Sequence, residues 1–222
     1  MPAVLYGEAA DKVCLFIHGK CGNKEEAERL SEIICPHGFQ VLGIDLPEHG
    51  ERKDDSGKLV PWDAVPELQS VLSYAKAHWQ SISLHATSIG GYFSLLAFGD
   101  EVFEKALFVS PVADMCALIE NMMQWSNVSE ERLAAEKEIP TDFGETLSWE
   151  YYTYVKTHPI AKWSSKTAIL YARHDNLTDR KTITEFAGRF GCDLQIYEDG
   201  EHWFHTEEQL AVWRDFVKKE LL

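Results

Sequence analysis

Residues 82–98 of this 222-residue sequence read ISLHATSIGGYFSLLAF. An apolar run of strand length meets a turn of small residues around Ser88 and continues into an apolar run of helical length. A hydroxyl on so sharp a strand-to-helix turn stands clear of the backbone, as a nucleophile must. Gly90 and Gly91 suit this turn because strand and helix approach each other closely there. The segment predicts a reactive serine at the end of a buried strand, and the alternative for Ser88 is a helix-capping role.

Short apolar runs of strand length recur on both sides of this segment, and stretches of helical character lie between them. The strand-like runs are 13–17, 40–44, 82–84, 106–109, 168–171 and 194–197, and the helical stretches are 25–35, 65–79, 89–98, 182–190 and 206–221. Asn23 with Glu26, and Thr206 with Gln209, have the spacing of capping boxes. The alternation predicts an α/β protein with a mostly parallel sheet and helices on both faces, in which function sits at the carboxyl ends of the strands.

Net charge and cysteine content limit the partners and the cellular compartment that we expect for this protein. Apolar residues make up 45 % and charged residues 26 %, which is typical of globular proteins. With 21 basic and 36 acidic residues the net charge is −15, so we expect no nucleic acid and no membrane as partners. The start MPAVLYGEAADK lacks the pattern of a secretory signal, which predicts a cytoplasmic protein with its five cysteines reduced. A homodimer is left open.

Four further segments carry polar residues at the ends of predicted strands. VCLFIHGKCGNKEEAE (13–28) ends its apolar run at His18-Gly19, and FQVLGIDLPEHGER (39–52) follows the next strand. TAILYARHDNLTD (167–179) places Asp175 after a strand, and DLQIYEDGEHWFH (193–205) places His202 after the last one. Taken with the serine turn, these segments resemble the α/β-hydrolase family in order and over nearly the whole chain. The family turn reads G-x-S-x-G, and Ala86 stands here at its first glycine.

The resemblance implies the α/β-hydrolase fold and a carboxylesterase-like serine hydrolase. Its members place a nucleophile, an acid and a base in the chain order Ser88, Asp175, His202. It further implies an oxyanion hole made by the backbone N–H groups of Lys20 and Ile89. The expected reaction is cleavage of a small carboxylic ester or thioester through an acyl-enzyme intermediate. No cofactor and no metal are expected.

Alternatives remain at each position. His205 is a second candidate for the base, although it directly precedes a predicted helix start. Asp114 is a second candidate for the acid, whereas Asp179 suits the start of the following helix. His49 and Arg52 more simply shape their loop, with the alternative that Arg52 binds a substrate carboxylate. The same constellation also serves peptidases and acyltransferases, and some members of the family bind ligands without turnover.

The segment at about 112–162 interrupts the alternation of strands and helices. It shows no strand pattern and is helical, charged and rich in aromatic residues, so we expect a helical cap inserted into a single domain of residues 1–222. By the resemblance, such an insertion covers the active site. Its aromatic side chains either line an acyl or aryl pocket or pack the cap helices; they are Trp125, Phe143, Trp149, Tyr151, Tyr152, Tyr154 and Trp163.

Overall fold

A mostly parallel sheet of seven strands forms the centre of the computed structural model, which describes all residues, 1–222. The strands are β1 (Ala3–Tyr6), β2 (Lys12–Ile17), β3 (Phe39–Ile44), β4 (Ser81–Thr87), β5 (Ala106–Val109), β8 (Thr167–His174) and β9 (Asp193–Glu201). Their order across the sheet is β1-β3-β2-β4-β5-β8-β9, and only β1 runs antiparallel to its neighbour. The predicted fold class is confirmed.

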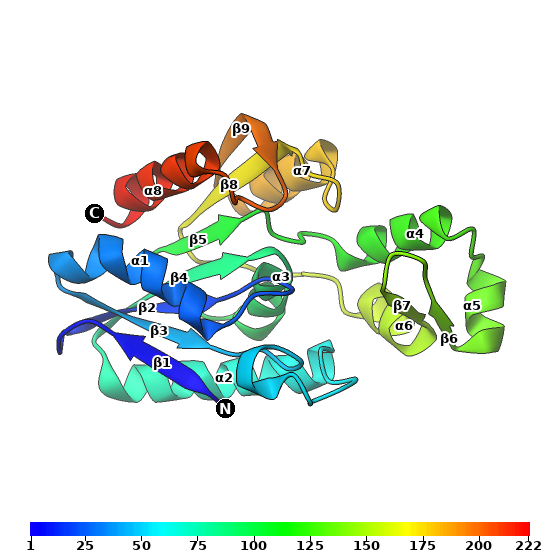
Figure 1. The fold of residues 1–222 in the computed structure, drawn as a ribbon, viewed down its shortest axis with the longest axis horizontal. Helices are drawn as coiled ribbons and strands as arrows, with labels where there is room; N and C mark the ends of the chain where they lie inside the picture. Colours follow the sequence, from blue (N-terminus) through cyan, green and yellow to red (C-terminus); the bar gives the residue numbers. More distant parts are fainter. The chain divides into compact units, whose positions relative to one another are not determined.

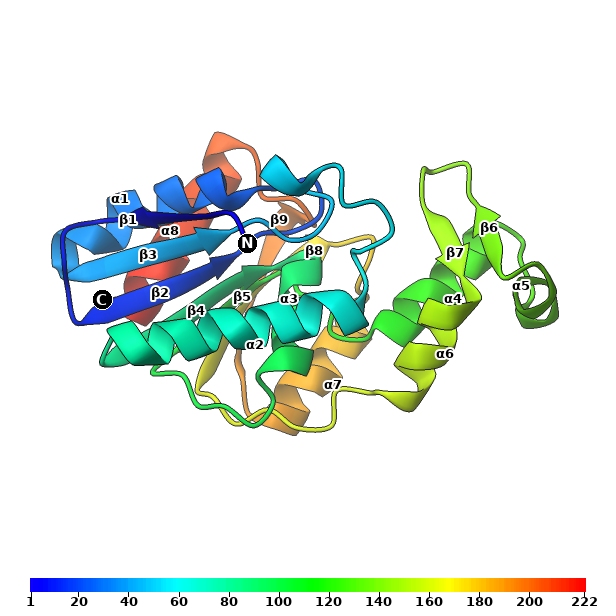
Figure 2. The ribbon, with the colours of Figure 1, turned by 90° about the horizontal axis from the view of Figure 1, so that it is seen from below.

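Helices cover both faces of this sheet (Figure 1). On one face lie α1 (Ala27–Ile34) and α8 (Glu207–Leu221). On the other lie α2 (Pro61–His78), α3 (Ser88–Ala97) and α7 (Arg180–Phe190), which Figure 2 shows below the strands, with α1 and α8 above them. Strands β2, β3 and β5 are buried along almost their whole length, as two-sided coverage requires. The core therefore consists of apolar strand residues packed against one stripe of each helix.

Several element boundaries differ from those expected from the sequence. Strand β1 was not predicted, because its four residues alternate between exposed and half-buried and lack an apolar run. Helix α2 begins four residues earlier than expected, at Pro61, which occupies the first turn where its missing N–H costs nothing. Asn23 caps a short 3-10 turn by accepting from the Glu25 N–H, so the predicted capping box with Glu26 is not formed there. The box of Thr206 and Gln209 is present at the start of α8.

Residues Asp114–Ala161 form a second compact unit. It contains α4 (Met115–Trp125), α5 (Glu130–Glu136), β6 (Glu138–Pro140), β7 (Thr146–Ser148) and α6 (Trp149–Thr157). The antiparallel pair β6 and β7 corrects the expectation that this segment has no strands, since three-residue strands are too short to give a periodic signal.

Aromatic residues pack inside each unit. Trp125 and Phe143 meet edge to face within the second unit. Trp163, which we had grouped with the insertion, belongs instead to the first unit, where it is buried against Phe108 and donates its indole N–H to Thr167. The role of the other aromatic residues toward a substrate stays a prediction.

None of the helices combines the length and the apolar content needed to cross a lipid bilayer.

Candidate active site

Ser88 lies at the sharp turn between β4 and α3. Its φ is +51°, a left-handed conformation that is uncommon for a residue with a side chain and that persists only where the surroundings enforce it. Gly90 lets α3 lie close to the end of β2 at this turn, because a Cβ at this position would lie 2.3 Å from the His18 carbonyl oxygen. Ala86 is an ordinary buried strand residue paired with Ile17 on β2, which explains why a methyl group is accommodated where the family has glycine.

Three side chains that are distant in the sequence meet at the carboxyl edge of the sheet. His202 Nε2 lies 2.8 Å from the Oγ of Ser88, and His202 Nδ1 lies 2.7 Å from Oδ2 of Asp175. Ser88 is 8 % exposed, the side chain of His202 is 15 % exposed and that of Asp175 is fully buried. The structure thus brings together the three residues named from the sequence.

Asp175 is held in place by its own loop. Its second oxygen, Oδ1, accepts hydrogen bonds from the backbone N–H groups of Leu177 at 2.8 Å and Thr178 at 2.9 Å. These bonds orient the carboxylate and leave Oδ2 for the imidazole. With Nδ1–H donating to Asp175, the Nε2 of His202 carries a lone pair that faces the hydroxyl of Ser88. The geometry suits removal of a proton from that hydroxyl.

The two backbone groups expected for an oxyanion hole belong to two segments that approach each other at Ser88. Ile89 is the second residue of α3, and the first N–H groups of a helix have no acceptor within the helix and lie at the positive end of its dipole. Gly19 lies beside Ser88, because a Cβ built on it would be 3.3 Å from the Cβ of Ser88. This contact brings the loop of residues 18–22, here called the Gly19 loop, up to Ser88. The role of Lys20 and Ile89 in anion binding stays a prediction.

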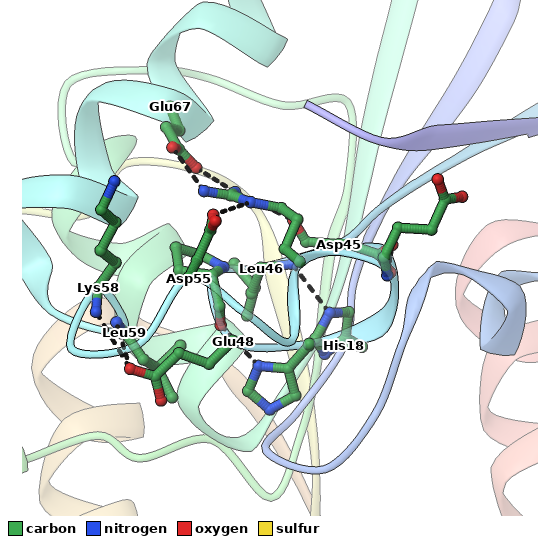
Figure 3. Close-up of polar contacts among 12 residues, drawn as sticks. His18, Asp45, Leu46, Glu48, Asp55, Lys58, Leu59 and Glu67 are labelled. Atoms are coloured by element: carbon green, nitrogen blue, oxygen red, sulfur yellow. Dashed lines mark hydrogen bonds and ion pairs between the residues drawn. The ribbon is translucent and has the colours of Figure 1, made fainter.

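Two histidines hold the Gly19 loop in place. His18 is buried and accepts from the Leu46 N–H at 3.0 Å, while its Nδ1 lies 2.7 Å from the Gly19 carbonyl (Figure 3). Burial lowers the pKa of His18 to about 4, so the ring is neutral at pH 7 and can be both donor and acceptor. His49 accepts from the Cys21 N–H at 2.9 Å, and Cys21 adopts a left-handed φ of +64°.

A buried ion pair stabilises the base of the same loop. Lys24 and Asp45 form a 2.9 Å contact with both side chains nearly or fully buried. Burial alone would raise the pKa of Asp45, but hydrogen bonds from the backbone N–H groups of Glu51 and Lys24, together with the Lys24 ammonium, hold it below its ordinary value. Sequence reasoning missed the burial of Lys24, because a lysine in a helix-entry loop is usually solvated.

Arg52 is engaged by the protein itself. Its guanidinium donates to both carboxylate oxygens of Glu67, at 2.5 and 2.9 Å, and to Asp55 at 2.9 Å. Figure 3 shows the two carboxylates directed at this one guanidinium group. Arg52 therefore shapes its loop, as the simpler of the two interpretations predicts.

The rival candidates for base and acid have other partners. His205 is exposed, stacks on Trp203 and directs Nδ1 at the Trp203 carbonyl. Asp114 accepts from the Ala117 N–H at the start of α4, and Asp179 accepts from the Thr182 N–H at the start of α7. Both aspartates therefore serve as helix caps.

One group near the site was not found from the sequence. Thr178 is buried and bonds both the Asp175 carboxylate and the Pro111 carbonyl. Its position three residues after Asp175 was the only available signal. No group of three or more His, Cys, Asp and Glu side chains is arranged to hold a metal ion.

Comparisons with known proteins place this geometry in context. No protein-family model and no curated protein sequence matches the chain. Among solved structures, Est1E from Butyrivibrio proteoclasticus with ferulic acid bound is similar at a TM-score of 0.80 and 18 % identity, over 98 % of this chain and 92 % of that one. Mouse alpha/beta hydrolase domain-containing protein 10 is similar at a TM-score of 0.79 and 12 % identity, over 98 % and 92 %.

A monoacylglycerol lipase from Paleococcus ferrophilus is also similar, at a TM-score of 0.71 and 14 % identity, over 98 % of this chain and 97 % of that one. At such identities the likeness concerns the fold. The strand order, the position of the serine turn and these structural neighbours agree with the resemblance seen in the sequence. The chain therefore has the α/β-hydrolase fold.

Proposed function

We propose that this chain is a serine hydrolase that cleaves a small carboxylic ester, with Ser88 as nucleophile, His202 as general base and Asp175 as the acid that orients it. The observation that carries the proposal is the continuous pair of contacts from Ser88 Oγ to His202 Nε2 and from His202 Nδ1 to Asp175 Oδ2. A serine hydroxyl is a weak nucleophile until an adjacent base accepts its proton. The structural neighbour named as a monoacylglycerol lipase supports an ester bond as the target.

In the first half of the proposed reaction, His202 Nε2 accepts the hydroxyl proton while Ser88 Oγ bonds to the ester carbonyl carbon. Negative charge moves to the carbonyl oxygen, where the N–H groups of Lys20 and Ile89 would stabilise it. Collapse of this intermediate breaks the bond to the alcohol, and the departing alkoxide oxygen takes the proton from His202. Asp175 stabilises the imidazolium throughout.

In the second half, water attacks the acyl carbon and gives its proton to His202 Nε2. The bond to Ser88 Oγ then breaks, the proton returns to that oxygen, and the carboxylic acid leaves. A thioester reacts by the same steps with a thiol as leaving group. Because all parts of this scheme act on the acyl carbonyl, they do not select the acyl chain.

The test is labelling with a fluorophosphonate probe together with turnover of an ester panel of varied acyl length. Ferulic acid is bound in the similar Est1E structure, so the panel includes a feruloyl ester. We expect labelling that is lost in Ser88→Ala, and turnover that falls by about 10⁴- to 10⁶-fold in His202→Ala. Labelling that persists in Ser88→Ala would overturn the proposal.

Matched variants test each assigned role. His205→Ala should retain turnover, because His205 faces its own tryptophan neighbour. Asp114→Asn should likewise retain it, whereas Asp175→Asn should lose it by about 10⁴-fold. Retained turnover in Asp175→Asn would transfer the acid role to another residue. Labelling without turnover of any ester would favour a peptidase or thioesterase.

A further inference from the structure

The turn that follows β5 supports the nucleophile from behind. Ser110, directly after the strand, has a φ of +42°, so it is a second strained serine beside the one at the end of β4. The Ser110 N–H donates to the Leu170 carbonyl at 2.9 Å, and the Val112 N–H donates to the carbonyl oxygen of Ser88 at 3.1 Å. Strained backbone persists only where neighbours enforce it, and here each serine turn is tied to the next element of the sheet.

Pro111, the central residue of this turn, packs against the nucleophile helix. A Cβ built on Gly91 of α3 would lie 2.9 Å from the Pro111 Cβ. The turn of residues 110–112 therefore contacts the nucleophile segment twice, once through the hydrogen bond to Ser88 and once through the ring of Pro111. A displacement of this turn would move the start of α3 with it.

Thr178 joins this turn to the acid. It is 4 % exposed, its N–H donates to Oδ1 of Asp175 at 2.9 Å, and its hydroxyl donates to the Pro111 carbonyl at 3.1 Å. Its own carbonyl accepts from the Tyr171 hydroxyl at 2.8 Å. Burial, and then the charge of Asp175, raise the pKa of Tyr171 to about 12, so this phenol remains a donor. One buried residue thus contacts Asp175 directly and, through Pro111, the turn that supports Ser88.

We propose that Thr178 is a positioning residue of the hydrolase: its N–H holds the carboxylate of Asp175, and its hydroxyl sets the place of the 110–112 turn that supports Ser88. The inference rests on the proposed function, because the distance between Ser88 and the His202 imidazole affects the rate only if His202 accepts the Ser88 proton. Reactive groups displaced by about 1 Å can lose about 10²-fold in rate without loss of substrate binding. The hydroxyl of Thr178 should therefore affect kcat and leave KM nearly unchanged.

The experiment compares Thr178→Val, Thr178→Ser and a control, Thr167→Val. Valine has the shape of threonine but leaves the Pro111 carbonyl without its donor, whereas serine keeps the hydroxyl. Thr167 is also buried, at 2 % exposure, and also donates to a backbone carbonyl, at 2.8 Å, but it lies at the opposite end of β8. Each variant is measured for kcat, KM, the rate constant of fluorophosphonate labelling and the melting temperature.

For Thr178→Val we expect kcat and the labelling rate to fall by about 10- to 100-fold with KM changed less than about threefold. Thr178→Ser should stay within about threefold of the parent in each quantity, and Thr167→Val should lower the melting temperature while keeping the labelling rate. Equal labelling rates in Thr178→Val and the parent would overturn the inference. So would equal losses in Thr178→Val and Thr167→Val, which indicate a general loss of stability.

Two further measurements keep the test decisive. If Thr178→Val does not fold, Tyr171→Phe removes the bond that supports Thr178 from the other side, and an unchanged labelling rate there refutes the inference. Failure of the proposed function has a different signature, since labelling would then be absent from the parent or would persist in Ser88→Ala. If the parent protein labels only through Ser88 and Thr178→Val labels at the same rate, the inference about Thr178 fails while the proposed function stands.

Discussion

The close approach of α3 to β2 at Gly90 makes a quantitative prediction for Gly90→Ala. A Cβ on Gly90 would lie 2.3 Å from the His18 carbonyl oxygen and 2.9 Å from that of Ile17. Real Cβ atoms essentially never approach closer than 3.0 Å, and both contacts are to backbone, which has no rotamer to change. Helix and strand must therefore separate by about 0.7 Å.

This separation should harm activity more than stability. Overpacking of this kind costs about 1–3 kcal/mol, which in a chain of this size lowers the melting temperature by about 3–10 °C. Ser88 starts the displaced helix and Gly19 belongs to the loop on the other side, so the proposed nucleophile and the Gly19 loop move apart. By the sensitivity of rates to such shifts, the labelling rate should fall by about 30- to 100-fold.

The assay is a thermal unfolding curve together with the rate constant for fluorophosphonate labelling. Gly188→Ala is the matched control, because Gly188 is also inside a helix, α7, and a Cβ there meets no atom within 4 Å. That change should raise stability by about 0.5–1 kcal/mol through helix propensity and leave the labelling rate unchanged. If Gly90→Ala gains stability like its control and labels at the parental rate, the reasoning is refuted.

Three further predictions concern residues of the loops behind the site and His85 of β4. His49→Ala removes the acceptor of the Cys21 N–H, so kcat should fall about tenfold and unfolding should become easier by about 1–2 kcal/mol, as measured by urea titration. Burial lowers the pKa of His18 and His85 to about 4, so from pH 6.5 down to about 4 the unfolded chain binds more protons and each residue lowers stability by about 1.4 kcal/mol per pH unit. His85→Gln should remove about half of that slope, and an unaltered slope between pH 7 and pH 5 contradicts the assignment. Arg52→Lys loses a bidentate pairing and should cost about 1 kcal/mol of stability with KM for neutral esters unchanged; a raised KM for carboxylate-bearing esters would indicate a role in binding.

Much of the sheet was predictable because strands buried on both faces appear in the sequence as continuous apolar runs. The apolar runs that became β2 through β5, β8 and β9 are strongly patterned, and the polar residues after them mark the carboxyl edge. That edge is where parallel strands bring distant residues together, so Ser88, Asp175 and His202 could be named before their contact was known. Strand β1 was not predictable, because a partly exposed edge strand needs no apolar run.

The supporting interactions were harder to predict because they depend on distance and not on spacing along the chain. Nothing in the residues around Lys24 indicates that its ammonium is buried against Asp45, 21 positions away. The hydrogen bond of the Thr178 hydroxyl was equally hard to predict, since the accepting carbonyl of Pro111 lies 67 positions earlier in the sequence. Pairings between loops at the same sheet edge require the register of the strands, which single-sequence patterns do not specify.

Because His202 is synthesised long after Ser88, the contact between them forms late in folding. Ser88 is made early, but the imidazole that would activate it follows β9, an edge strand that can dock only on β8. A nascent or interrupted chain therefore contains the alcohol without its partner. Such non-local pairing is slow to form, so competence for chemistry arises as one of the last events of maturation.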